Sequence, residues 1–121
     1  MLKTRIALGA VLEGTPGKLE EIEKRMNEFS RKRWASQPAA PSAGCMFKNP
    51  VTVPAGKLID ELGLKGTRVG GARVSAEHGN FLVTDETATA RDVLELIELI
   101  RCRARAERGL ELETEVEIIG E

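Results

Sequence analysis

The segment from Thr89 to Gly109 constrains the fold of this chain more than any other stretch of the sequence. Its apolar residues recur at every third or fourth position and would form one stripe along a helix: Val93, Leu96, Ile97, Ile100 and Ala104. Thr89 and Asp92 have the spacing of a reciprocal N-terminal cap, and Gly109 is typical of a helix C-terminus. Because a single apolar stripe has to be buried against another element, we expect this helix to pack on a sheet.

Short β-rich runs on both sides of this helix would supply the sheet. Residues 68–76 and 80–85 are predicted to form two strands, joined through the turn Glu77–Gly79. Residues 4–12 would form an opening strand, and residues 111–120 a closing strand with Val116 and Ile118 on one face. This order of elements predicts an α+β fold, in which helices pack on a small, mainly antiparallel sheet.

Two further helices are expected ahead of the first predicted strand pair. Thr15 would cap one of them, with Pro16 in its first turn, and this helix would bury a stripe made of Leu19, Ile22, Met26 and Phe29. The segment 55–63 would form a short helix with Leu58, Ile59 and Leu62 facing inward. Residues 37–44 are too few for a linker between domains, so we expect a shaped loop leading to Cys45 within one folded unit.

Composition excludes several classes of protein. The 18 Lys and Arg balance 19 Asp and Glu, and three Phe and one Trp are too few for a base-stacking surface, so we expect no nucleic-acid partner. No apolar run approaches the roughly 20 residues of a membrane helix, and the N-terminal stretch lacks a signal-peptide cleavage site. Cys45 and Cys102 have no zinc-site spacing, so we expect no metal site and reduced thiols in a cytoplasmic protein.

The residues that carry chemistry are few, and each has an ordinary structural interpretation. A lone cysteine such as Cys45 is more often a small buried side chain than a reactive thiol. His78, the only histidine, lies in a predicted turn, where either a solvated ring or a binding residue is expected. Glu115 would normally be a solvent-facing strand residue. The glycines of "GTRVGG" lack the spacing of a dinucleotide or phosphate-binding loop.

Taken together, however, the motifs "FKNP", "AGKLI", "GLKG", "GGARVS" and "EVEIIG" occur in an order and spacing that is far more specific than any one of them. Through them, nearly the whole chain resembles the C-terminal, substrate-binding domain of UDP-N-acetylenolpyruvoylglucosamine reductase, also called UDP-N-acetylmuramate dehydrogenase. Only "VTVP" separates Asn49-Pro50 from "AGKLI", which resembles the compact form without an insertion. Residues 1–36 resemble the tail of the preceding flavin domain and a connecting helix, and residues 37–121 the substrate-binding domain.

The resemblance implies an activity, its cofactors and its partners. The family reduces UDP-N-acetylglucosamine enolpyruvate to UDP-N-acetylmuramate in peptidoglycan precursor synthesis, with FAD recharged by NADPH. The flavin-binding region of the family has no counterpart in this chain. We therefore expect the chain to be inactive alone, to bind no FAD, and to depend on the missing N-terminal flavin domain. An excised domain, a split subunit and a natural remnant would each have this sequence.

The resemblance also implies residue roles. Cys45 stands where most relatives carry the serine that protonates the enol formed by hydride transfer, and a thiol gives up a proton more readily than an alcohol. Glu115 matches the catalytic carboxyl of the family, and Asn49 and His78 match substrate contacts. Glu117 stands where relatives usually carry arginine, which changes the surroundings of Glu115.

Two alternatives remain open on the residues alone. The chain could be a non-catalytic module that keeps the UDP-sugar pocket, which the exchange of arginine for Glu117 favours. It could also be a thiol redox protein that uses Cys45, which the lack of a nearby second cysteine disfavours.

Overall fold

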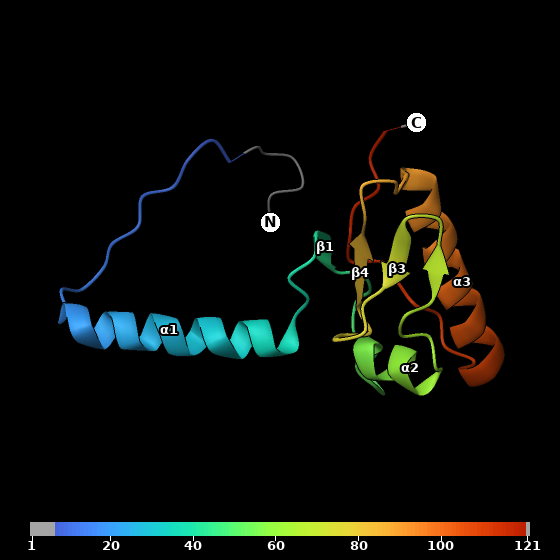
Figure 1. The fold of residues 1–121 in the computed structure, drawn as a ribbon, viewed down its shortest axis with the longest axis horizontal. Coiled ribbons are helices and arrows are strands. Elements are labelled where there is room, and N and C mark those ends of the chain that lie inside the picture. The colour runs from blue at the N-terminus through green and yellow to red at the C-terminus, as the bar shows by residue number, and fades with distance from the viewer. Residues whose placement is uncertain (1–6, 121) are drawn as a thin grey trace. The chain divides into compact units, whose positions relative to one another are not determined.

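The computed structural model describes residues 7–120, and these fall into two units that divide between Arg31 and Lys32 (Figure 1). The first unit contains an irregular segment, residues 7–18, and most of helix α1 (Leu19–Ser36). The second unit contains the strands β1 (Ser42–Cys45), β2 (Arg68–Val69), β3 (Ala72–Val74) and β4 (Phe81–Thr84), and the helices α2 (Ala55–Glu61) and α3 (Ala90–Arg108).

The first unit differs from the prediction in two ways. The opening strand predicted for residues 4–12 is absent from residues 7–12, because no described strand pairs with them. Residues 4–6 lie outside the described residues. The helix begins at Leu19, not near Thr15, and none of its residues is buried within the described chain. The predicted burial of its apolar stripe was therefore wrong: Leu19, Met26 and Phe29 keep 60–69% of their surface exposed, and Ile22 keeps 43%.

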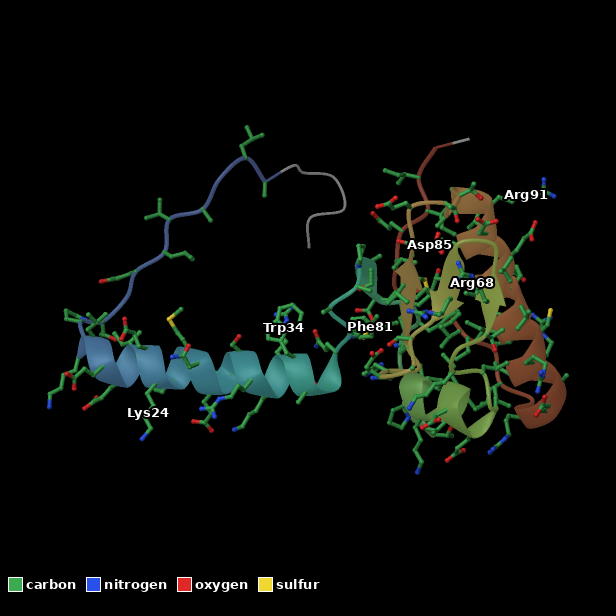
Figure 2. All side chains as sticks on the ribbon, in the orientation of Figure 1. Lys24, Trp34, Arg68, Phe81, Asp85 and Arg91 are labelled. Carbon is green, nitrogen blue, oxygen red and sulfur yellow. The ribbon has the colours of Figure 1, made fainter. Side chains whose placement is uncertain are left out.

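The four strands of the second unit form one antiparallel sheet in the order β1-β4-β3-β2. Helix α3 packs against β2 and β3, and α2 contacts α3. The chain thus has an α+β fold with helices on a small antiparallel sheet, as predicted. Figure 2 shows Arg68 of β2 next to Asp85, which follows β4, and the two side chains form an ion pair.

Helix α3 confirms its sequence signals. Thr89 accepts a hydrogen bond from the backbone N–H of Asp92, whose carboxylate accepts one from the N–H of Thr89. Gly109 ends the helix at φ +62°, in the left-handed region that favours glycine. Four of the five predicted stripe residues are buried and Val93 is partly buried. They join a core to which most other elements contribute: Met46, Phe47, Leu58, Ile59, Leu64, Val74, Leu82 and Leu112, among others.

The strand prediction needs three corrections. Residues 68–76 form the two strands of a hairpin, β2 and β3, because the chain reverses at Gly70 and Gly71. A Cβ atom on Gly71 would lie 2.3 Å from the backbone N of Ala88, so only glycine fits this close approach. Residues 111–120 form no strand but a single bridge between Thr114 and Phe47. Residues 42–45, expected in a loop, form β1 at the edge of the sheet.

Candidate functional site

A groove of about 330 Å³ lies on the second unit, where the end of β1, the start of α2 and the turn before β4 meet. Three of the four residues predicted to form the site line it, namely Cys45, Asn49 and His78. We call it the Cys45 groove; its other walls come from Pro54, Gly56, Lys57, Asp60, Lys65, Glu77, Gly79 and Asn80.

Cys45 ends β1 at an exposed position. Its Cα pairs with that of Phe81 on β4, and the register shifts between Ser42 and Cys45. Gly44 before it has φ +84°, a conformation that favours glycine. The motif "AGC" therefore provides the bend at which an edge strand presents a thiol to the groove.

Asn49 lies between Cys45 and α2 and has one of its two polar atoms in use. Its Oδ1 accepts a hydrogen bond of 2.9 Å from the backbone N–H of Ala55, the first residue of α2. The described residues offer no partner to its Nδ2, which is a hydrogen-bond donor. The side chain is thus held by the helix while its amide hydrogens stay available to a ligand.

His78 is oriented by Asn80 and Phe81, which follow it in the chain. Its Nδ1 accepts a hydrogen bond of 3.1 Å from the backbone N–H of Asn80, and its ring meets that of Phe81 edge to face at 4.8 Å. A neutral imidazole whose Nδ1 accepts carries its proton on Nε2. The ring therefore offers a donor at Nε2.

Glu115 does not line the groove, but its backbone reaches the segment that does. Its N–H donates a hydrogen bond of 2.8 Å to the carbonyl of Met46, the residue after Cys45. The N–H of Lys48 donates to the carbonyl of Glu113, so two hydrogen bonds tie the C-terminal segment to residues 46–48. The side chains of Glu115 and Glu117 are both exposed.

Sequence reasoning missed two groups in the groove. Lys57 and Lys65 bring positive charge to it, although Lys65 pairs with Asp60 at 3.0 Å and Lys57 with Glu61 at 3.7 Å. Asn80 is only 2% exposed and forms hydrogen bonds to both sides of the groove. The signal that could have revealed it is an amide residue at the start of the apolar run "NFLV".

Glu77, also in the groove, is an acid held in its charged form. Its carboxylate accepts a hydrogen bond of 2.6 Å from Ser75 Oγ, which lowers the pKa of Glu77 below its ordinary value. It therefore adds a negative charge to the wall that carries His78.

The glycine-rich turn of this chain leaves no space for the pyrophosphate of FAD. The Gly70–Gly71 turn is the nearest equivalent of a phosphate-binding loop, yet a Cβ atom on Gly70 would lie 2.4 Å from the carboxyl carbon of Asp92. That carboxylate already accepts hydrogen bonds from the N–H groups of Thr89 and Gly71, so neither N–H is available to a phosphate. The turn is thus filled by the protein itself.

The described residues contain neither a cluster of metal-ligating side chains nor a membrane-spanning helix. Across residues 7–120, no three His, Cys, Asp or Glu side chains are grouped so that they could hold a metal ion. In the same residues, no helix combines the length and apolarity needed to cross a membrane.

Comparison with known proteins agrees with the motifs. Residues 37–119 match the family model described as "UDP-N-acetylenolpyruvoylglucosamine reductase, C-terminal domain". The reductase of that name from Syntrophomonas wolfei is 42% identical over 117 residues, which are 96% of this chain and 39% of the relative. The one from Caldanaerobacter subterraneus is 44% identical over 120 residues, or 98% and 40%.

A solved structure supports the same relationship. The crystal structure of the reductase from Thermus caldophilus is 54% identical to this chain and superposes with a TM-score of 0.63, covering 79% of this chain and 34% of its own. This chain thus spans roughly two fifths of the length of the two relatives named above. The family model covers well over half of the chain. The chain belongs to the family of the UDP-N-acetylenolpyruvoylglucosamine reductase C-terminal domain.

Proposed function

We propose that this chain is the substrate-binding and proton-donating domain of a reductase that converts UDP-N-acetylglucosamine enolpyruvate into UDP-N-acetylmuramate for peptidoglycan synthesis. The observation that carries the proposal is the Cys45 groove, in which the thiol and the amide of segment 45–49 and the imidazole of the turn before β4 line one space. Each of these residues occupies a position that the family motifs assign to the reaction or to substrate binding.

Substrate binding uses the donors of the groove. The Nδ2 of Asn49 and the Nε2 of His78 are suited to the acceptor oxygens of a diphosphate or a uracil ring. Lys57 and Lys65 add positive charge for a diphosphate, and their present ion pairs with Glu61 and Asp60 are of the surface kind that contributes little to stability.

Cys45 donates a proton in the second half of the reaction. Once a hydride has been added to the methylene carbon, the neighbouring carbon carries an electron pair shared with the carboxylate group as an enol. The S–H bond of Cys45 breaks, the proton forms a new C–H bond with that pair, and the sulfur is left as a thiolate that water reprotonates. The backbone of Glu115 is hydrogen-bonded to Met46, the residue after Cys45, and its carboxyl group would stabilise the enol or help to return the proton.

The hydride originates outside this chain. FAD, reduced by NADPH, would supply it from the flavin-binding region that the family resemblance implies; in this chain, the Gly70–Gly71 turn is occupied by the Asp92 carboxylate. The exposed apolar stripe of α1, made of Leu19, Ile22, Met26 and Phe29, is suited to pack on that region. We use the term assembled reductase for this chain combined with the part of the Thermus caldophilus relative that this chain does not cover, where we expect the flavin-binding region to lie.

A second candidate function is a non-catalytic UDP-sugar-binding module. It is favoured by Glu117, an anion in place of the usual arginine near the candidate acid Glu115. Both candidates predict sugar-nucleotide binding in the groove, but only the first predicts turnover in the assembled reductase.

The test combines binding and activity. The isolated chain should remain colourless when incubated with FAD, and UDP-N-acetylglucosamine enolpyruvate should shift the NMR signals of Cys45, Asn49 and His78. The assembled reductase should oxidise NADPH in the presence of this substrate. Binding without turnover would select the non-catalytic module, and binding of stoichiometric flavin by the isolated chain would contradict the assignment.

A further inference from the structure

We infer that Asn80 is a positioning residue, which holds the Cys45 side of the groove against the His78 side. Its geometry stands by itself; only its consequence for turnover rests on the proposed function. Asn80 lies immediately before β4, is 2% exposed, and forms hydrogen bonds with both the segment 45–49 and the turn that carries His78.

The first set of contacts fixes the thiol segment. The Oδ1 of Asn80 accepts a hydrogen bond of 2.9 Å from the N–H of Phe47, and its Nδ2 donates one of 2.8 Å to the carbonyl of the same residue. The backbone carbonyl of Asn80 also accepts a hydrogen bond of 2.8 Å from the N–H of Met46. One residue thereby fixes the two residues that follow Cys45.

The second set of contacts fixes the imidazole. The N–H of Asn80 donates to Nδ1 of His78, which leaves the proton of the neutral ring on Nε2. The carbonyl of His78 accepts a hydrogen bond of 3.1 Å from the N–H of Phe81, so the turn is closed around Asn80. Displacement of Asn80 would therefore move the thiol and the imidazole relative to each other.

The amide is matched to its site. Phe47 is 1% exposed, so its N–H and carbonyl have no access to water and depend on the side chain of Asn80. A buried polar group that loses its partner is strongly unfavourable, and the segment is expected to shift until the groups find water. An amide supplies its donor and its acceptor on two separate atoms, which can meet the carbonyl and the N–H of one residue at the same time.

Ser75 provides a matched control. It is also buried and polar, but its hydroxyl bonds lie within its own turn, to the N–H groups of Glu77 and His78 and to the carboxylate of Glu77. Ser75→Ala therefore removes buried hydrogen bonds close to His78 without touching residues 46–48.

The experiment measures amide hydrogen exchange in the 121-residue chain. The amides of Lys48 and Glu115 report on the thiol segment, because they bond the carbonyls of Glu113 and Met46, and not Asn80. The amide of Val74, bonded to the carbonyl of Thr67, serves as the reference. In Asn80→Ala, exchange at Lys48 and Glu115 relative to Val74 should rise at least about tenfold, while Ser75→Ala should leave this ratio unchanged.

Asn80→Asp adds a reversible test. A protonated carboxyl offers one acceptor and one O–H donor, as the amide does, whereas a carboxylate offers acceptors only. The exchange ratio in Asn80→Asp should therefore be high at neutral pH and return toward the wild-type value as the carboxyl is protonated in acid. Cys45, Lys57, Asp60, Lys65, Glu77 and His78 line the same groove, so Asn80→Ala, which keeps all of them, is measured at each pH for comparison.

These measurements test the positioning role of Asn80 even if a substitution weakens the fold. Unchanged exchange at Lys48 and Glu115 in Asn80→Ala would overturn it. If all amides exchange faster, including that of Val74, the comparison of Asn80→Asp in acid and at neutral pH decides, and the lack of any acid recovery would overturn it.

In the assembled reductase, Asn80→Asp should lower kcat/KM by about 10 to 100-fold at neutral pH, the scale expected when reacting groups are misplaced. Ser75→Ala should lower it much less. Failure of every variant and of the wild type to bind a sugar nucleotide would count against the proposed function, and the exchange ratios would still decide the role of Asn80.

Discussion

A Cβ atom on Gly56 would lie 2.9 Å from Cε1 of His78, so the first turn of α2 and the candidate histidine are in direct contact. This contact explains why the motif "AGKLI" places a glycine inside a helix, where glycine costs about 1 kcal/mol relative to alanine. The missing side chain provides the space in which the imidazole lies.

Gly56→Ala should therefore affect substrate binding more than it affects the free energy of unfolding. The free energy of unfolding should change by no more than about 1 kcal/mol, because the better helix propensity of alanine offsets the loss of the hydrogen bond between Asn80 N–H and His78 Nδ1. The Michaelis constant of the assembled reductase should rise several-fold because the ring is displaced. A double-mutant cycle provides the control: in the His78→Ala background, Gly56→Ala should have no further effect on the Michaelis constant. Additive effects would show that Gly56 acts by some route other than the histidine.

Asn49 has two roles that two substitutions can separate. Asn49→Ala removes both the acceptor for the Ala55 N–H and the free amide donor, so it should lower the free energy of unfolding by about 1 kcal/mol and raise the Michaelis constant. Asn49→Asp keeps the acceptor, and its stability should stay near that of the wild type. If Asn49→Asp binds substrate as well as the wild type, Nδ2 is not a substrate ligand.

The sequence predicted best those features that short-range contacts determine. Helix α3 was predicted correctly because its caps, Thr89 with Asp92 and Gly109, act within one helical turn. The hairpin at Gly70 and Gly71 was predicted as one strand because the close approach of Ala88 comes from a segment 17 residues further along the chain. The predicted closing strand was wrong because only residues 46–48 offer it hydrogen bonds.

The candidate site shows the same division. Cys45, Asn49 and His78 were chosen from motifs, and the structure places all three in one groove. Nothing local in the sequence indicates how these residues are brought together. That depends on Asn80, which bonds Phe47 across a separation of 33 residues.

The N-terminal cap of α3 should make the free energy of unfolding depend on pH in the acid range. The N–H groups of Thr89 and Gly71 donate to the Asp92 carboxylate and hold the pKa of Asp92 below its ordinary value of 3.8. A carboxyl whose pKa is lower in the folded state contributes stability above its unfolded pKa, and this contribution is lost as the pH falls through the folded pKa. The difference in unfolding free energy between wild type and Asp92→Asn should therefore be largest near neutral pH and shrink below pH of about 4.

Urea unfolding at several pH values measures this difference. Glu86→Gln provides the control, because Glu86 is an exposed carboxyl in the same loop for which the structure records no hydrogen bond or ion pair. A difference for Asp92→Asn that stays constant with pH would mean that the carboxylate charge does not contribute to the cap.

The apolar stripe of α1 can be tested as a docking surface for the flavin-binding region. Met26→Gln and Phe29→Gln should leave the unfolding free energy of this chain nearly unchanged, because both side chains are already at least 60% exposed. In an assay with the flavin-binding region supplied as a separate chain, each substitution should raise the concentration needed for half-maximal activity by about tenfold, which corresponds to losing about 1.5 kcal/mol of apolar burial.

Lys24→Gln is the control, because Figure 2 shows Lys24 and Trp34 projecting to different sides of α1, and the helical period places Lys24 opposite Met26. Equal losses for Lys24→Gln and Phe29→Gln would indicate a general effect on the helix and not a docking stripe.

The thiol of Cys45 should be the proton donor in the assembled reductase. Cys45→Ala removes the donor but leaves the hydride-transfer step possible, so substrate should still oxidise the reduced flavin in a single turnover, while steady-state turnover should fall by roughly 10² or more. Cys45→Ser should recover much of this loss, because a hydroxyl can donate from the same position at the end of β1. Cys102→Ser removes the other exposed thiol, on α3 and outside the groove, and should leave turnover unchanged. If Cys45→Ala turns over as fast as the wild type, Cys45 only lines the groove, and the proton must come from Glu115 or from water.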